Sequence, residues 1–209
     1  MTKVGIVDYG LGNRRSVEKA VERVGAQALL TADHQELRVC DGVILPGVGA
    51  FPAGMALLRS GGFDELLHEL VDAGVPVFGC CLGMQLLFET SSEHGGAEGL
   101  GLIPGVVRAL EPVADLKLPH IGWSEVHWQT QSNLLAGLPS PSVFYHVHSY
   151  VPDPADPADI LGTSRYGTEF ASVVGRGNVF GAQFHPEKSS LHGLRMLQNF
   201  TALCARQPA

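Results

Sequence analysis

The sequence predicts an α/β fold in which a mostly parallel central sheet is flanked by helices and continued by an antiparallel extension. Three observations lead to this prediction. Short apolar runs alternate with amphipathic helical stretches in the first half of the chain, which is typical of a parallel sheet covered on both faces. Strand-like runs follow one another closely in the second half, with little helix between them. The length of 209 residues, without a long linker, fits a single domain spanning residues 1–209.

The first half of the chain supplies the predicted parallel strands and two helices. One helix has apolar residues at helical spacing from Val17 to Val24 and stops before Gly25. The other runs from Phe63 to Val71, has acidic residues in its first turn, and ends at Gly74. The apolar runs between and around these helices predict strands at Val4–Asp8, Gln27–Thr31, Gly42–Leu45 and Val75–Gly79.

The second half supplies the predicted antiparallel extension and the last helix. That helix covers roughly residues 190–205 and presents a leucine-rich face. The proline-rich stretch 152–157 is expected to be a stiff surface loop. Strands are predicted at Gly105–Leu110, Glu125–Trp128, Val143–Val151, Ile160–Tyr166, Phe170–Val174 and Asn178–Phe184.

Charge, hydropathy and cysteine spacing narrow the class of protein. The net charge is −7 and no basic run is present, which argues against a nucleic-acid partner. No apolar stretch approaches the roughly 20 residues that a membrane-spanning helix requires. The four cysteines form no C-x-x-C pair, so neither a zinc site nor a thioredoxin-like motif is expected. A reducing cytoplasm is the expected location.

The strongest functional pattern is the segment from Val77 to Gln85, in which an apolar strand leads into Gly79-Cys80-Cys81-Leu82-Gly83 and then into a helical stretch, Met84–Phe88. This is the cysteine form of the nucleophile elbow, a sharp turn between strand and helix. Flanking glycines allow close backbone approach, and a helix N-terminus favours the reactive thiolate of Cys81. The pattern alone is equally compatible with two small buried cysteines at a strand end, and for Cys80 that interpretation is favoured.

A nucleophilic cysteine needs a base, and the base needs a group that orients it. Phe184-His185-Pro186-Glu187 follows a predicted strand late in the chain. In an extended segment His185 and Glu187 share a face, so the carboxylate can fix the tautomer of the imidazole. Taken with the elbow, this spacing predicts a Cys81, His185 and Glu187 triad.

Two further patterns indicate a function less specifically. The glycine-rich turn after the strand at Gly42–Leu45 lacks the G-K-[ST] and G-x-G-x-x-G patterns of phosphate-binding loops. It can instead supply amides to an oxyanion hole, or it can be a turn and nothing more. His146 and His148 alternate on a predicted strand, but no third ligand is recognisable, so no metal is expected.

Together these motifs resemble the class I, triad-type glutamine amidotransferases over essentially the whole chain. Within that class the chain is most similar to the glutaminase subunits of imidazole glycerol phosphate synthases, in histidine biosynthesis. Six blocks in order match the family pattern: residues 8–13, 46–51, 81–85, 119–123, 148–150 and 184–189. The sequence departs from the usual pattern at Arg14, Cys80, Ser124 and His146, and three of these, all but Cys80, are expected near a partner interface.

The resemblance implies an activity and a role for each matched residue. Cys81 attacks the side-chain amide of L-glutamine, His185 protonates the departing ammonia, and water releases L-glutamate from the thioester, without a cofactor. Glu187 orients His185. The oxyanion hole would be formed by Gly47, Val48, Gly49 and Leu82. The glutamine contacts would be Gln85, Glu93, Ser149 and Tyr150. The partner interface would contain Gly10, Asn13, Trp123, Tyr145 and Lys188.

The same resemblance implies a heterodimer with a (β/α)₈ cyclase/synthase subunit that uses the ammonia to form imidazole glycerol phosphate and aminoimidazole carboxamide ribotide. A chain of this length has no room for a synthase domain of its own. Two alternatives stay open at this point: a glutaminase for the pyridoxal-phosphate or anthranilate system, and a non-catalytic interaction module on the same fold. The isolated subunit is expected to be nearly inactive, because a Gly-Val-Gly loop can hold its amides turned away until the partner docks.

Overall fold

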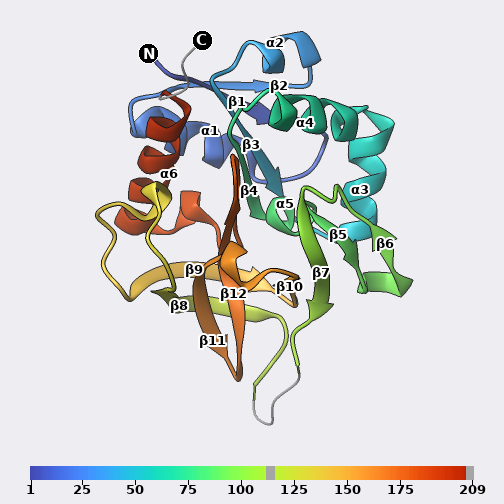
Figure 1. Ribbon diagram of the computed structural model, residues 1–209, viewed down its shortest axis with the longest axis vertical. Helices are drawn as coiled ribbons and strands as arrows, with labels where there is room; N and C mark the ends of the chain where they lie inside the picture. The colour runs from blue at the N-terminus through green and yellow to red at the C-terminus, as the bar shows by residue number, and fades with distance from the viewer. Residues whose placement is uncertain (112–115, 206–209) are drawn as a thin grey trace.

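The computed structural model describes residues 1–111 and 116–205, which form two sheets and the helices packed on them (Figure 1). The larger sheet has nine strands within the described residues. Five neighbouring strands are parallel, and the remaining four continue the sheet antiparallel. Their spatial order is β2 (Gln27–Thr31), β1 (Lys3–Val7), β3 (Gly42–Gly47), β4 (Val77–Cys81), β13 (Val179–Ala182), β12 (Thr168–Arg176), β11 (Ile160–Tyr166), β8 (His120–Trp128) and β9 (Ser142–His148). The predicted fold class is confirmed.

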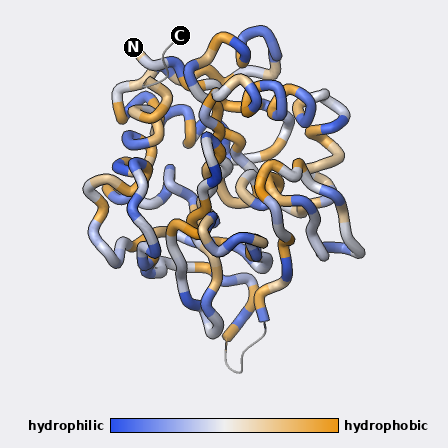
Figure 2. The backbone as a smooth tube through the Cα atoms, in the orientation of Figure 1, coloured by the Kyte–Doolittle hydropathy of each residue, from blue (hydrophilic) through white to orange (hydrophobic). Residues whose placement is uncertain are grey.

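Helices cover both faces of the parallel strands (Figure 1). Helices α1 (Arg14–Arg23) and α6 (Ser190–Cys204) pack on one face, and α3 (Phe51–Ser60) and α4 (Phe63–Asp72) pack on the other. Each face has its own apolar core. Hydrophobic and hydrophilic residues alternate along α4 (Figure 2), as expected of a helix with one buried face. The remaining helices are short: α2 (His34–Arg38), α5 (Leu82–Gln85) and the 3₁₀ turns Glu93–Gly95, Asn133–Leu135, Pro157–Asp159 and Pro186–Lys188.

A second, four-stranded sheet lies beside the parallel strands. Its strands follow the order β10 (Tyr150–Pro154), β7 (Ile103–Ala109), β5 (Phe88–Ser91) and β6 (Ala97–Glu98). The chain passes from the larger sheet to this one between β9 and β10, at Ser149. Two groups of predicted site residues, at the ends of β9 and β4, therefore lie where the two sheets meet.

The structure corrects three predicted elements. The strand predicted at Val143–Val151 is two strands, β9 and β10, in different sheets. The surface loop predicted at 152–157 begins later than expected, because Pro152 is buried and β10 continues to Pro154. Proline is tolerated there since β10 is the edge strand of its sheet. The helical stretch predicted at Met84–Phe88 is only the single turn α5, and Phe88 already begins β5.

Helices α2 and α3 are absent from the sequence-based prediction. Helix α3 begins at Phe51 with proline in its first turn, a position where the missing amide hydrogen costs nothing. It buries Phe51, Met55 and Leu58 against the sheet. Its start fixes the end of the glycine-rich loop that follows β3.

Candidate active site

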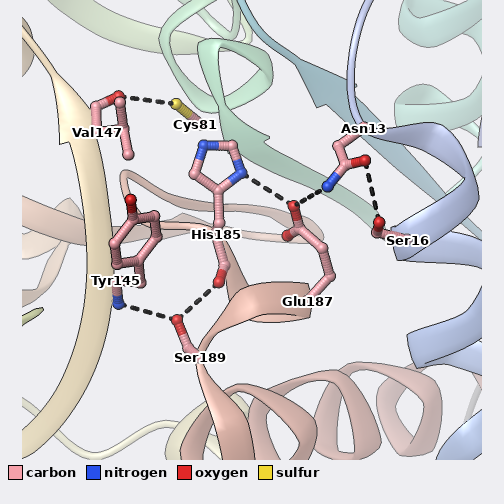
Figure 3. A network of polar contacts seen from close by, with 8 residues as sticks. All are labelled: Asn13, Ser16, Cys81, Tyr145, Val147, His185, Glu187 and Ser189. Carbon is pink, nitrogen blue, oxygen red and sulfur yellow. Dashed lines mark hydrogen bonds and ion pairs between the residues drawn. The ribbon is translucent and has the colours of Figure 1, made fainter. Parts of the chain in front are cut away.

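The carboxyl ends of the parallel strands meet at one edge of the sheet, and Cys81 lies there at the end of β4. It is both the last residue of the strand and the N-cap of α5. Its backbone has φ 55° and ψ −115°, a conformation that non-glycine residues rarely adopt. Such strain is found where a structure holds a functional side chain in place. The turn directs the sulfur toward the Val147 carbonyl, 3.7 Å away (Figure 3).

Glycine is required on both sides of this turn because the backbones are in contact. A Cβ at Gly83 would lie 1.9 Å from the Leu45 carbonyl oxygen, and one at Gly79 would lie 2.6 Å from the Gly83 oxygen. Contacts below 3.0 Å are essentially never made by a Cβ. The close approach predicted for the elbow glycines is therefore present.

His185 lies between the Cys81 sulfur and the Glu187 carboxylate (Figure 3). Its Nδ1 is 3.0 Å from Glu187 Oε1, and both side chains are buried. Because an ionised carboxylate can only accept, Nδ1–H is the donor, which leaves the opposite ring nitrogen for Cys81. Burial lowers the pKa of His185, but hydrogen bonds with Cys81 and Glu187 and the charges of both groups outweigh it and raise that pKa to about 9.

Backbone and side-chain contacts fix this arrangement from behind. Ser189 Oγ donates to the His185 carbonyl at 2.6 Å and accepts the Tyr145 amide at 3.0 Å, and the His185 amide donates to the Tyr145 carbonyl at 3.0 Å. Asn13 Nδ2 lies 3.4 Å from Glu187 Oε1. The segment that holds His185 is thereby tied to β9, and Asn13, predicted at the partner interface, also contacts the carboxylate that orients His185.

A cavity of about 290 Å³ opens beside Cys81 and His185. Most residues predicted from the sequence for glutamine and oxyanion contacts line it, together with Lys188 from the predicted interface. The lining residues that match predictions are Val48, Gly49, Cys81, Leu82, Gln85, Glu93, Ser149, Tyr150, His185 and Lys188. Gly47 is the exception: it packs against the elbow, where a Cβ would meet the Gly83 nitrogen at 2.6 Å.

The amide of Gln85 has a defined orientation in this cavity. Its Nε2 donates to the Tyr150 carbonyl at 2.9 Å and to Gln183 Oε1 at 3.1 Å. With both hydrogens used, the group that Gln85 offers to a ligand is its carbonyl oxygen. The Gln85 side chain therefore favours a ligand with a hydrogen-bond donor at that position.

The glycine-rich loop beside the cavity is held at both ends. The buried Tyr9 hydroxyl donates to the Pro46 carbonyl at 2.8 Å. Burial raises the pKa of Tyr9, so the hydroxyl stays a neutral donor. Glu93 Oε2 accepts the Phe51 amide at 2.7 Å at the other end. Between them Val48 and Gly49 are exposed, and Gly49 has φ 106°, a backbone conformation that favours glycine.

The predicted interface residues outside the cavity lie on exposed or half-buried surface. Trp123 is 55% exposed and stands opposite Tyr145 across β8 and β9, with ring centroids 5.8 Å apart. Ile121, two residues before Trp123, is 60% exposed. Gly10 is exposed in the loop after β1. An apolar face on β8 is thus uncovered near the predicted active site.

The structure shows what surrounds three residues that depart from the family pattern, His146, Arg14 and Ser124. His146 is fully buried on β9, so its side chain is closed to solvent although its neighbours Tyr145 and Gly122 flank the predicted interface. Its Nδ1 donates to the Phe144 carbonyl at 3.2 Å, and its Nε2 is 2.9 Å from Ser172 Oγ. Arg14 forms an ion pair with Asp8, and Ser124 Oγ lies 2.9 Å from His120 Nε2.

Residues 1–111 and 116–205 contain no group of three or more histidine, cysteine, aspartate or glutamate side chains arranged to hold a metal ion. Among the same residues, no helix is long and apolar enough to cross a membrane.

Sequence reasoning missed the supporting contacts of Ser189, Gln183 and His120. Ser189 is the most accessible to prediction, since it stands four residues after His185, where a hydroxyl can reach that residue's carbonyl. Gln183 and His120 are far from their partners in sequence, 98 and 28 residues respectively. Their contacts follow only from strand order and register.

Comparison with known proteins agrees with the geometry. The model of the family described as glutamine amidotransferase class-I matches residues 5–204. Two relatives are named imidazole glycerol phosphate synthase subunit HisH. The protein of Moorella thermoacetica is 47% identical over 97% of this chain and 96% of its own length. The protein of Bacillus cereus is 48% identical over 94% of this chain and 93% of its own length.

Solved structures share the fold at low sequence identity. A structure described as glutamine amidotransferase superposes with a TM-score of 0.76 at 21% identity, covering 97% of this chain and 98% of that one. The glutaminase domain of Trypanosoma brucei CTPS superposes with a TM-score of 0.71 at 19% identity, covering 100% of this chain and 96% of that one.

Proposed function

We propose that this chain, which belongs to the class I glutamine amidotransferases and within them to the family of imidazole glycerol phosphate synthase subunit HisH, hydrolyses L-glutamine with Cys81 as nucleophile. It then delivers the ammonia to a synthase subunit. The observation that supports the proposal best is the placement of His185 between Cys81 and Glu187, at the edge of a cavity lined by Gln85. A nucleophile, a base and an orienting carboxylate meet there in the order that covalent catalysis requires.

The proposed reaction has two halves. The Cys81 thiolate attacks the side-chain carbonyl carbon of glutamine, and the protonated His185 gives its proton to the nitrogen as the C–N bond breaks and ammonia leaves. His185 then takes a proton from water, whose oxygen attacks the thioester carbon; the C–S bond breaks, glutamate leaves with its acid proton lost to solvent, and the Cys81 thiolate and protonated His185 are restored. The pKa of about 9 for His185 means that the imidazole holds a proton near neutral pH, as the first half requires.

Stabilising the oxyanion in both halves is assigned to the Leu82 amide and to the loop from Gly47 to Gly49. The Leu82 amide directly follows the nucleophile, the position that supplies a donor in nucleophile elbows. Val48 and Gly49 line the same cavity. We assign the glutamine contacts to Gln85, Glu93, Ser149 and Tyr150, of which Gln85 offers an oriented acceptor to the substrate's ammonium or amide group.

The proposed partner is a (β/α)₈ cyclase/synthase subunit, bound as a heterodimer, that forms imidazole glycerol phosphate and aminoimidazole carboxamide ribotide from the ammonia. The names of the relatives favour this partner over the pyridoxal-phosphate and anthranilate systems. We place the interface on the surface that contains Gly10, Asn13, Trp123, Tyr145 and Lys188. The exposed Ile121 and Trp123 supply apolar area of the kind that protein interfaces bury.

A cytoplasmic location belongs to the same proposal. Cys40, Cys80, Cys81 and Cys204 are free, the state in which a reducing compartment keeps thiols.

Glutamate release from L-glutamine by the purified chain, with and without the cyclase subunit and its acceptor ligand, tests the proposal. The expected result is slow release by the chain alone and much faster release in the complex, because an exposed glycine-rich loop can hold its amides turned away until the partner docks. Equal rates would contradict the partner-dependent oxyanion loop. No release under either condition would contradict the assigned activity.

A further inference from the structure

Three buried histidines lie at the glutamine cavity: His148 on β9, which lines it, and His120 on β8 and His146 on β9, which do not. His120 and His148 face each other across the two strands, and His120 Nδ1 is 3.2 Å from His148 Nε2. His148 Nδ1 is 3.1 Å from the Tyr150 carbonyl, and His120 Nε2 is 2.9 Å from Ser124 Oγ. Ser124, His120 and His148 thus form one continuous series of hydrogen bonds, called the histidine relay below.

The direction of every hydrogen bond in the relay follows from its last acceptor. The Tyr150 carbonyl can only accept, so His148 Nδ1 must hold a hydrogen. A neutral His148 then accepts at Nε2, which makes His120 Nδ1 the donor. His120 accepts in turn at Nε2, and the hydroxyl of Ser124 donates to it. Burial lowers the pKa of His120, and burial together with the neighbouring histidines lowers that of His148, so both rings are held in this neutral form.

The relay ends at a carbonyl that shapes the cavity. The Tyr150 oxygen accepts from His148 Nδ1 and from Gln85 Nε2. Ser149, between His148 and Tyr150, is the point where the chain leaves the nine-stranded sheet. Its carbonyl accepts the Leu110 amide at 2.8 Å. The corner formed by residues 148–150 is therefore fixed from both sides, and Gln85 depends on it for its orientation.

We propose that His148 and His120 are positioning residues for glutamine binding: through the relay they hold the Tyr150 carbonyl, and through that carbonyl the Gln85 amide, in the geometry that receives the substrate. The proposal rests on the function proposed above. His120 does not line the cavity, so its effect on the substrate passes through His148. The relay begins at Ser124, next to the exposed Trp123, so it extends from the proposed partner interface to the wall of the glutamine cavity.

His146 provides a matched control within the same cluster. It is fully buried on the same strand as His148, and its ring lies 5.5 Å from that of His148. Its hydrogen bonds, however, go to the Phe144 carbonyl and to Ser172, and not to Tyr150. Replacing His146 with phenylalanine therefore tests the loss of a buried imidazole without interrupting the relay.

The experiment measures how fast Cys81 of the full-length chain is alkylated by two reagents: iodoacetamide, which needs only a reactive sulfur, and a chloroketone analogue of L-glutamine, which also needs the glutamine site. His148→Phe is expected to slow the chloroketone about 3- to 10-fold, the effect of one lost hydrogen bond, and to leave the iodoacetamide rate unchanged. His148→Asn, whose amide nitrogen falls where Nδ1 lies, keeps the bond to the Tyr150 carbonyl but not the one to His120, so it is expected to restore most of the chloroketone rate. His120→Phe should slow the chloroketone less, and His146→Phe should change neither rate.

The outcomes separate the two proposals. If the ratio of the chloroketone rate to the iodoacetamide rate is no higher for the wild-type chain than for a free thiol, the glutamine site itself is wrong and the relay proposal falls with it. If the wild type prefers the chloroketone but His148→Phe behaves as His146→Phe does, the positioning role is overturned and the proposed function stands. An equal fall with both reagents would also overturn the positioning role, since it would show a general disturbance of Cys81.

Discussion

Replacing Gly83 with alanine should disable the site by displacing the turn that holds Cys81. The new Cβ would lie 1.9 Å from the Leu45 carbonyl oxygen and 2.8 Å from its carbon. Leu45 is fully buried on β3, which is paired with β1 on one side and β4 on the other. Because β3 cannot retreat without breaking both pairings, the displacement falls on α5 and on Cys81.

The size of the effect follows from this overlap. Restoring an ordinary contact of about 3.5 Å requires a shift of about 1.5 Å. Overpacking of this kind costs about 1–3 kcal/mol of stability. Alanine's better helix propensity on α5 offsets about 1 kcal/mol of that, so a net loss of about 2 kcal/mol is the upper expectation. Activity should fall much further, since a misplacement of about 1 Å at a reacting group costs on the order of 10²-fold.

Two measurements test this prediction: urea unfolding of the chain and glutamate release by the reconstituted complex. Gly177→Ala is the control variant for both. Gly177 lies in the turn between β12 and β13, has φ 58°, and has no neighbour within 4 Å of a would-be Cβ. Alanine there should cost about 1 kcal/mol for the left-handed backbone and leave activity intact. A Gly83→Ala variant with normal activity would refute the claim that backbone contact at the elbow positions the nucleophile.

Three other predictions address the surroundings of the site. The pKa of His185 is raised from 6.5 to about 9, so the stability it contributes should be fully present below about pH 6.5 and lost as the pH rises through about 9. The advantage of wild type over His185→Gln in unfolding free energy should therefore shrink by about 3 kcal/mol across that window, and a pH-independent difference would contradict this. Ser189→Ala leaves the Tyr145 amide without its partner and should cost about 1–3 kcal/mol in urea unfolding, whereas the exposed Ser60→Ala should cost little; similar losses would argue against the role given to Ser189. Trp123→Ala should leave the unfolding free energy nearly unchanged but weaken cyclase binding by about 2 kcal/mol in calorimetry, and unaltered affinity would place the interface elsewhere.

Local sequence patterns predict elements whose ends are marked by turn-forming residues. The strands at Gln27–Thr31 and Ile160–Tyr166 are predicted with the bounds that the structure has, and Gly25 comes before the first strand and Gly167 directly after the second. Alternation cannot reveal a change of sheet, however, so the pattern through Val143–Val151 conceals the break at Ser149. Proline and glycine at the start of α3 similarly conceal a helix whose stability comes from packing of its buried face.

The residues of the candidate site also fall into those that local sequence patterns predict and those that they do not. The elbow around Cys81 and the pair His185 and Glu187 are local patterns, and the structure brings them together as the sequence predicts. The contact of Asn13 with Glu187 joins residues 174 positions apart, and the pairing of His120 with His148 depends on the register of β8 and β9. Contacts of this kind are set by strand order and register, which single-sequence patterns do not determine.

The role of Cys81 as nucleophile can be tested by measuring glutamate release by Cys81→Ala and Cys80→Ala in the complex with the cyclase subunit. Both cysteines are buried at the end of β4 and both variants remove one sulfur, but burial raises the pKa of Cys80 far above its ordinary value, which keeps that sulfur an unreactive thiol. Cys81→Ala should abolish glutamate release, and Cys80→Ala should keep it close to the wild-type rate. Glutamate release that survives in Cys81→Ala would show that Cys81 is not the nucleophile.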